Sequence, residues 1–400
     1  MNMSTSKNRM VQLACMGLVA AVSLCGQDTA AATDVVRGFQ VTTTHTGALQ
    51  VSGVNPPLTM RWSVSLAGTA SYPIVERGKV FVIGGDSGST PSTLYALDAQ
   101  TGATVWSQSA PSGFGSWIGA TYENGVLYVV PTSNPMFGSG AMFAFAAGDG
   151  HQVWSANLPG QYSFSTAPTA RNGIVYTSGA GSGGTVYAVS ETNGAVLWTA
   201  GVENGDSSAP AVTPKGVYVS YVCPQTYRFN PTTGAQIWHY SGGCEGGGGE
   251  SAAVYKGLVY VRDLIGYTTD GITISAATGK QVGGFNSQYS PVFLNGTAFY
   301  TEADTLTAVD VSSGATVWTS VAPAGESYSC SPIIVNTTIY AGTSAGNLYG
   351  YNTTTGANVF SMNLGQPISC GEYFAVPLAG IGAGDGLLVV PAGNEVVALQ

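Results

Sequence analysis

Acidic and aromatic side chains recur at equivalent positions along this 400-residue chain. They stand in short segments that lead into an apolar, strand-like run, often beside serine and proline, as in Ser71-Tyr72-Pro73. Aromatic rings can stack on a planar or sugar-like ligand, while hydroxyl and carboxylate groups hydrogen-bond to it. The predicted ligand-binding residues are Tyr72, Trp117, Asp206, Glu250, Tyr289, Glu326, Tyr328, Glu372 and Tyr373. The alternative is that the Ser-x-x-Pro pattern only turns the chain into the next strand.

The sequence lacks complete motifs for protease catalysis, phosphate binding and metal binding. Gly85-Asp86-Ser87-Gly88 resembles the nucleophile loop of trypsin-like proteases, but none of the three histidines stands in a recognisable triad setting. The run Gly246–Gly249 lacks the lysine and the helix of a phosphate-binding loop. Scattered histidines and the absence of a dense carboxylate cluster argue against a structural zinc or EF-hand calcium site. We therefore assign no catalytic and no metal-binding residue.

The composition narrows the class of protein. Charged residues make up only 8% of the chain, and the net charge is −9, which argues against a nucleic-acid partner. The 44% hydrophobic content argues against a disordered chain, and the low charge argues against a long charged coiled coil. Because a single core stops growing near ~250–300 residues, the length predicts several domains or a repeat array.

The N-terminus has the form of a secretory signal peptide. Lys7 and Arg9 precede the apolar stretch Met10–Cys25, and Ala30-Ala31-Ala32 offers a small-residue cleavage site. We predict a signal peptide over 1–32, a linker over 33–57 and a mature chain without a transmembrane segment.

Lipidation is the alternative for this terminus. Cys15 and Cys25 both follow apolar residues, although Leu24 is bulkier than lipoprotein processing prefers. We expect an exported chain, periplasmic or extracellular, with attachment to the outer membrane as the open alternative. The expected oligomeric state is a monomer.

The strongest signal is an internal repeat of about forty residues. Ala96-Leu97-Asp98-Ala99-Gln100-Thr101-Gly102-Ala103-Thr104-Val105-Trp106 aligns with Ala308-Val309-Asp310-Val311-Ser312-Ser313-Gly314-Ala315-Thr316-Val317-Trp318. The last position of this pattern, the docking slot, recurs 35 to 48 residues apart. It is occupied by Trp62, Trp106, Trp154, Trp198, Trp238, Gly283, Trp318 and Phe360. Each unit reads as short strands around an Asx/Thr-Gly turn, with the aromatic residue wedged against the neighbouring unit.

Four short strands per unit predict an all-β, eight-bladed β-propeller of four-stranded antiparallel blades. The C-terminal segment offers three strand-like runs, Tyr373–Leu378, Gly386–Val390 and Glu395–Leu399, and then stops. The missing strand is predicted at Leu58–Leu66, so that the first and last segments share a blade and close the ring. The propeller is predicted over 58–400.

Ala-x-Asp-x-x-Thr-Gly-x-x-x-Trp resembles the repeat of the pyrroloquinoline-quinone (PQQ) dehydrogenase-type eight-bladed propellers, over about residues 58–400. This family includes PQQ- and calcium-dependent alcohol and sugar dehydrogenases and a non-catalytic propeller of outer-membrane protein assembly. The resemblance implies the scaffold. It does not carry over catalytic residues, because the chain lacks the adjacent Cys-Cys pair typical of the dehydrogenases.

Strand order predicts which loops share a face. Loops between second and third strands and loops between blades lie on one face, and the Thr-Gly turns lie on the other. Cys330 and Cys370 are one repeat apart, and Cys223 and Cys244 lie in successive loops of the first face. We predict the disulfides Cys330–Cys370 and Cys223–Cys244.

The favoured function is a binding or scaffold module at the cell envelope for a protein or glycan partner, without a cofactor. One alternative is a PQQ- and calcium-dependent alcohol or sugar dehydrogenase. The other is a propeller component of outer-membrane protein assembly.

Overall fold

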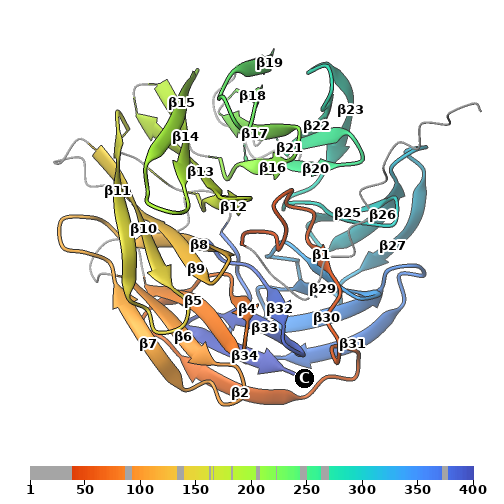
Figure 1. Cartoon of the computed structure of the whole chain (residues 1–400). Helices are drawn as coiled ribbons and strands as arrows, with labels where there is room; N and C mark the ends of the chain where they lie inside the picture. Colours follow the sequence, from red (N-terminus) through yellow and green to blue (C-terminus); the bar gives the residue numbers. More distant parts are fainter. Residues whose placement is uncertain are drawn as a thin grey trace, which may run out of the picture. The chain divides into compact units, whose positions relative to one another are not determined.

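The computed structural model describes residues 38–85, 92–132, 139–161, 164, 166–181, 183–203, 208–221, 223–243, 250–262, 270–371 and 377–400. These residues form strands and no helix, and none of them belongs to a helix that could span a membrane. The strands form eight sheets arranged as the blades of a ring (Figure 1). The predicted all-β, eight-bladed propeller is confirmed.

Each blade is a sheet in which successive strands pair antiparallel. From innermost to outermost strand, the first four blades are β4 (Ile74–Glu76), β5 (Lys79–Gly85), β6 (Thr93–Asp98) and β7 (Thr104–Ser109); β8 (Trp117–Glu123), β9 (Val126–Pro131), β10 (Ser139–Ala146) and β11 (Gln152–Pro159); β12 (Thr169–Arg171), β13 (Ile174–Gly181), β14 (Gly183–Ser190) and β15 (Val196–Val202); and β16 (Ala211–Thr213), β17 (Gly216–Tyr221), β18 (Gln225–Phe229) and β19 (Gln236–Ser241). The short strand β3 (Thr69–Ala70) also pairs with β5.

The remaining four blades follow the same order. They are β20 (Ala253–Tyr255), β21 (Leu258–Arg262), β22 (Asp270–Ser275) and β23 (Gln281–Asn286); β24 (Val292–Leu294), β25 (Thr297–Glu302), β26 (Thr305–Asp310) and β27 (Thr316–Val321); β28 (Ile333–Val335), β29 (Thr338–Gly342), β30 (Asn347–Asn352) and β31 (Asn358–Asn363); and β32 (Gly382–Gly384), β33 (Leu387–Ala392), β34 (Glu395–Leu399) and β2 (Met60–Ser65). We number these blades 1 to 8, so that β4–β7 form blade 1 and β2 completes blade 8.

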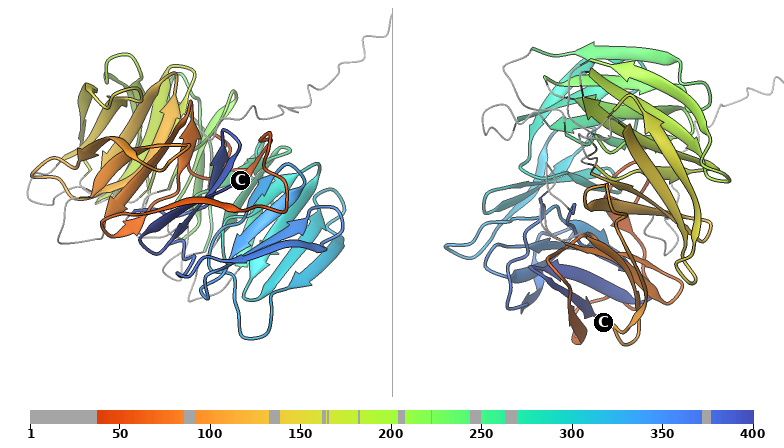
Figure 2. Two further views of the ribbon diagram at one scale, coloured as in Figure 1. Left: turned by 90° about the horizontal axis from the view of Figure 1, so that it is seen from below. Right: turned by 90° about the vertical axis from the view of Figure 1, so that its left-hand side faces the viewer.

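The ring closes as predicted, because β2 pairs antiparallel with β34. Both edge-on views in Figure 2 show the dark blue C-terminal strand beside the orange N-terminal one. The innermost strand of blade 8 is at Gly382–Gly384, so its prediction at Tyr373–Leu378 was wrong. A Cβ at Gly382 or Gly384 would collide with the carbonyl oxygen of Pro73 or Val75. Close backbone packing on blade 1 therefore requires glycine in this strand. For that reason the strand lacks the apolar pattern from which strands are predicted.

The docking slots build the seams between blades. Six tryptophans lie there, and each indole N–H donates to a carbonyl of the next blade: Trp62 to Ala99, Trp106 to Ala147, Trp154 to Glu191, Trp198 to Pro231, Trp238 to Ala276 and Trp318 to Thr353, at 2.8–3.2 Å. The ring also covers the glycine of that blade's Thr-Gly turn; a Cβ on Gly234 would lie 2.6 Å from the Trp198 ring. The repeat therefore encodes both partners of each such seam.

The turns are held as the sequence predicts. The Asp310 carboxylate accepts hydrogen bonds from the amides of Ser312 and Ser313, at 3.1 and 2.8 Å, and from both hydroxyl groups. Those hydroxyl and amide donors lower the pKa of Asp310 to about 2. Gly314 follows with φ +70°, a conformation that glycine adopts without steric cost.

An N-terminal segment lies inside the ring. Successive carbonyls of this segment accept amide hydrogen bonds from the innermost strands: Thr43 from Val212, Thr44 from Val254, Thr46 from Phe293 and Gly47 from Ile334, at 2.5–2.9 Å. The strand β1 (Ala48–Leu49) then pairs parallel with β28. Figure 1 shows this red-orange segment in the middle of the ring before it runs out past β1 toward β2. Residues 38–57 belong to the stretch 33–57 that is predicted as a linker.

Candidate ligand face

Of the predicted ligand residues that the structure describes, Tyr72, Glu250, Tyr289, Glu326 and Tyr328 lie in loops that lead into the innermost strands, and Trp117 is the first residue of β8. Tyr72 is buried there, between blades. Its hydroxyl donates to the Ala120 carbonyl at 2.5 Å, and its ring packs edge-on against Phe39, with ring centroids 5.9 Å apart. Burial raises the pKa of Tyr72 well above its usual value. The phenol is therefore neutral and engaged within the fold.

Trp117 is also fully buried. Its indole N–H donates to the carbonyl of Gln108 at 3.1 Å. Its ring meets Phe143 and Phe145 edge-on, with centroid distances of 5.2 and 6.0 Å. This side chain belongs to the core of blade 2.

Glu250 forms a buried ion pair with Arg262, and both side chains are 3% exposed. Arg262 also donates to the Gln288 carbonyl at 2.8 Å and to the Ser290 hydroxyl at 3.3 Å. Arg262 therefore connects Glu250 of blade 5 to the loop that carries the half-buried Tyr289. Sequence reasoning missed Arg262, although a charged residue at the end of the apolar run Leu258–Arg262 was the available signal.

Glu326 and Tyr328 form a second group, in the loop between blades 6 and 7. The Glu326 carboxylate accepts hydrogen bonds from Thr343, Asn347 and Tyr349 at 2.8–3.0 Å. Partial burial opposes ionisation of Glu326, but these three donors outweigh it and hold its pKa below the usual value. Tyr328 donates to the Tyr351 hydroxyl at 2.8 Å.

The predicted residues thus lie in separate groups. Tyr72 packs beside the axis, Trp117 in blade 2, Glu250 near Tyr289, and Glu326 near Tyr328. The remaining three predictions, Asp206, Glu372 and Tyr373, lie outside the described residues.

The serine hydroxyls of these loops make backbone hydrogen bonds. Ser71 accepts from the Ile83 amide at 2.9 Å, and Ser208 accepts from the Ser220 amide at 3.2 Å. Ser251 and Ser331 accept from amides of the preceding interblade loop, Ala209 and Ser290, at 2.9 and 3.1 Å. These contacts favour the alternative in which Ser-x-x-Pro orders the entry into each blade.

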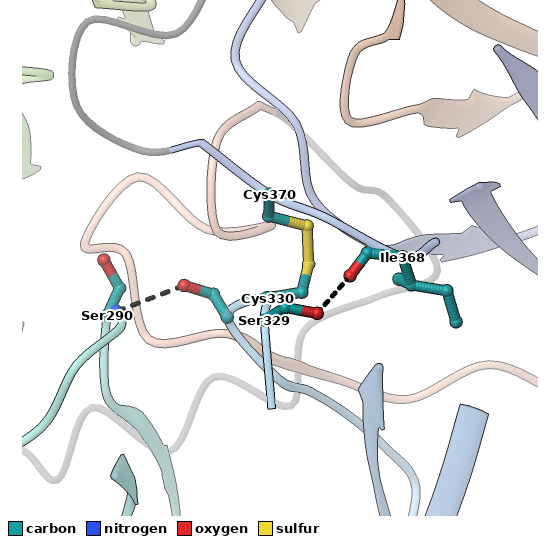
Figure 3. The surroundings of a disulfide bond; sticks show 6 residues. Ser290, Ser329, Cys330, Ile368 and Cys370 are labelled. Carbon is teal, nitrogen blue, oxygen red and sulfur yellow. Dashed lines mark hydrogen bonds between the residues drawn. A yellow bond between two sulfur atoms is a disulfide. The ribbon is translucent and has the colours of Figure 1, made fainter. Parts of the chain in front are cut away.

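The disulfide Cys330–Cys370 joins the loops that precede the innermost strands of blades 7 and 8, as predicted. Its Cα atoms lie 4.5 Å apart, and the Ser329 hydroxyl donates to the Ile368 carbonyl at 2.6 Å beside it (Figure 3). The second predicted pair involves Cys244, which lies outside the described residues. The bond thus fixes two neighbouring loops of the ligand face.

The N-terminal segment lies at the axis beside Tyr72. A hollow of about 10 Å³ lies there between Phe39, Tyr72, Ile333 and Ile381. His45 is buried in the same segment, and its Nδ1 hydrogen-bonds to the Ala252 carbonyl at 2.8 Å. Burial lowers the pKa of His45 to about 4, so the ring is neutral at pH 7.

PQQ and calcium would need room for a tricyclic quinone and several oxygen ligands. The axial hollow has space for about one water molecule. Within the described stretches, no three His, Cys, Asp or Glu side chains lie together as a metal site. The described residues at the axis therefore do not fit this cofactor.

Comparison with known proteins identifies one matching protein family. The family model described as outer membrane protein assembly factor BamB matches residues 50–112, 90–222 and 182–369. No curated protein sequence matches the chain.

Three solved structures illustrate the likeness in fold. BamB from Moraxella catarrhalis is 15% identical, with a TM-score of 0.61, over 86% of this chain and 99% of that one. The quinohemoprotein alcohol dehydrogenase from Comamonas testosteroni is 15% identical, with a TM-score of 0.70, over 93% and 81%. The computationally designed Ika8 protein is 12% identical, with a TM-score of 0.65, over 84% and 97%. Since a named enzyme, a named assembly factor and a designed protein share this fold, the fold alone does not define an activity. The family match covers most of the chain and agrees with its ring of eight blades, so the chain belongs to the BamB-like family of PQQ-type β-propellers.

Proposed function

We propose that this chain is a non-enzymatic binding module for a protein partner at the cell envelope. The observation that carries the proposal is the axis beside Tyr72, where the chain's own N-terminal segment leaves about 10 Å³. A redox cofactor or a small substrate bound at this axis would need a concave site of several hundred Å³. The matching family model is described as an outer membrane protein assembly factor, which supports a role in protein interaction.

The ligand face suits a partner that binds over loops. Glu326 is held by three hydrogen bonds, and the Cys330–Cys370 disulfide ties the adjacent loops together. Loops ordered before binding lose less conformational entropy when a partner docks. We therefore place the interaction surface on the face that carries Glu326, with Ser327 as an exposed position within it.

Site-specific photo-crosslinking in the producing cell tests this proposal. A photoreactive residue at Ser327 should give a discrete protein adduct, while the same residue at Thr101 serves as the control. Thr101 is also exposed but lies in a Thr-Gly turn on the opposite face. Adducts from Thr101 alone, or from neither position, would overturn the assignment of the face.

The enzyme alternative has a separate test. Purified protein is titrated with PQQ and calcium, and cofactor binding is followed by calorimetry while alcohol oxidation is followed by dye reduction. We expect neither binding nor dye reduction. Saturable PQQ binding with alcohol-dependent dye reduction would refute the non-enzymatic function.

A further inference from the structure

One seam of the ring has no aromatic residue in its docking slot. Between blades 5 and 6 the docking slot holds Gly283, which pairs with Thr273 immediately before a register shift. Trp198 occupies the same place in blade 3, where it pairs with Ala188 immediately before an equivalent shift. The backbone of this slot is therefore regular, and only the indole is missing.

An open cavity of about 590 Å³ lies at this slot, lined among others by Tyr260, Gly283, Tyr300, Val311 and Gly314. A Cβ on Gly314 would meet nothing within 4 Å, whereas the equivalent Cβ on Gly279 would lie 2.7 Å from the Trp238 ring. A volume of this size is in the range of small-molecule sites, roughly 300–1,000 Å³.

The aromatic residue against which the indole packs in other seams is retained here. On the second strand of four other blades, Phe81, Tyr128, Tyr176 and Tyr218 pack against the tryptophan of their own blade, with centroids 5.7–6.1 Å apart. Tyr260 holds the same position in blade 5, opposite the first residue of the innermost strand. It contacts Phe285 at 5.5 Å, and Phe285 stacks on Tyr300 at 5.2 Å. Phe285 thus narrows the seam, and the cavity persists beside it.

The hydrogen-bond acceptor is also retained. In the filled seams the indole donates to the residue that follows the turn's Asp, Asn, Ser or Ala; Trp318, for example, donates to Thr353, which follows Asn352. In blade 6 this residue is Val311, which follows Asp310 and lines the cavity. With glycine in the slot, no docking tryptophan reaches the Val311 carbonyl.

We propose that the seam between blades 5 and 6 is a binding site for a planar aromatic group with a ring N–H donor, of the indole class. The ring lies between Tyr260 and the flat surface of Gly314, and its N–H donates to the Val311 carbonyl. The Asp310 carboxylate at the rim disfavours anionic ligands. This site lies on the outer part of a seam and is independent of the proposed partner face.

Calorimetric titration with indole tests the site on the wild-type protein and on two variants. Gly283→Trp supplies the missing ring and should abolish indole binding. Val105→Trp is the matched control, because Val105 is 50% exposed and precedes Trp106 in a filled seam; it should bind indole like the wild type. 1-Methylindole lacks the donor, and its affinity should be about 2- to 10-fold lower.

N-acetyltryptophanamide is the third ligand, and it separates two sources of the indole group. Binding of both indole and the amide supports a site that also accepts a peptide-borne tryptophan. Binding of indole alone supports a free small molecule. No binding of either ligand up to its solubility limit would overturn the proposal. Equal binding to Gly283→Trp, or equal affinity for 1-methylindole, would also do so. If Gly283→Trp fails to fold, the 1-methylindole comparison still decides on the wild-type protein.

Discussion

Replacing Gly283 by tryptophan should stabilise the protein, which is the opposite of the usual effect of placing a large residue at a glycine. The position has room, because a Cβ built on Gly283 meets only Thr273, at 4.0 Å. The new indole would enter the cavity of about 590 Å³ and reach the Val311 carbonyl, as Trp238 reaches that of Ala276 in the preceding seam.

The expected gain follows from the filled seams, where Trp198 and Trp238 are each 8% exposed. Burying a large aromatic side chain contributes about 1.5–3 kcal/mol. The indole hydrogen bond adds about 0.5–1.5 kcal/mol, and removing a glycine from a strand adds roughly 0.5–1 kcal/mol. Immobilising the side chain costs about 1 kcal/mol. The net increase in unfolding free energy is therefore about 2–4 kcal/mol.

Guanidinium unfolding, followed by circular dichroism, measures this change. Val105→Trp is the control, since its ring remains in solvent and should shift the midpoint by less than about 0.5 kcal/mol. A Gly283→Trp protein that is no more stable than this control would show that the seam does not accept an indole in the repeat geometry. The reasoning from the six seams that hold a tryptophan would then fail.

Three further changes test other parts of the fold. Trp198→Ala should cost about 3–5 kcal/mol in the same unfolding assay, and Trp198→Phe only about 1–2 kcal/mol; equal losses would contradict a docking role for the indole ring. Burial and the neighbouring Glu123 raise the pKa of Glu191 to about 7. The folded state then binds the extra proton, so its contribution to stability is fully present below about pH 4.5 and is lost as the pH rises to about 7. The thermal midpoint of Glu191→Gln, measured across this range, should lack that component; an unchanged pH profile would refute the assignment. Replacing Cys330 and Cys370 together by serine opens a loop of 40 residues and should cost about 4 kcal/mol, and reducing agent should no longer shift the midpoint of the variant.

Much of the ring can be predicted from the sequence, because its contacts repeat. Docking tryptophans such as Trp198 and the Thr-Gly turns that they contact recur at a nearly constant spacing along the chain. This spacing indicates which segments meet. The Cys330–Cys370 pair and the closure by Leu58–Leu66 follow from the same count. The open seam also leaves a sequence signal, since Gly283 stands in a tryptophan slot.

Predictions failed or stopped where packing is not periodic. The strand at Gly382–Gly384 was not predicted, because it has no apolar pattern. Its glycines are required by the close approach of the blade 1 backbone. The ion pair that Glu250 forms was not predicted, because its buried partner Arg262 stands at the end of β21, twelve residues away. Neither contact has a fixed sequence spacing.

The architecture of this protein follows from its sequence, because the spacing of the repeat indicates the blade count, the docking tryptophans and the segments that close the ring. The contents of the axis and of the open seam depend on tertiary packing. Residues 38–47 satisfy amide groups of several innermost strands at once, so their place depends on where those strands converge. The cavity beside Gly283 depends on how far Phe285 and Tyr300 reach into it. Such volumes arise from many side chains distant in sequence, and no single spacing records them.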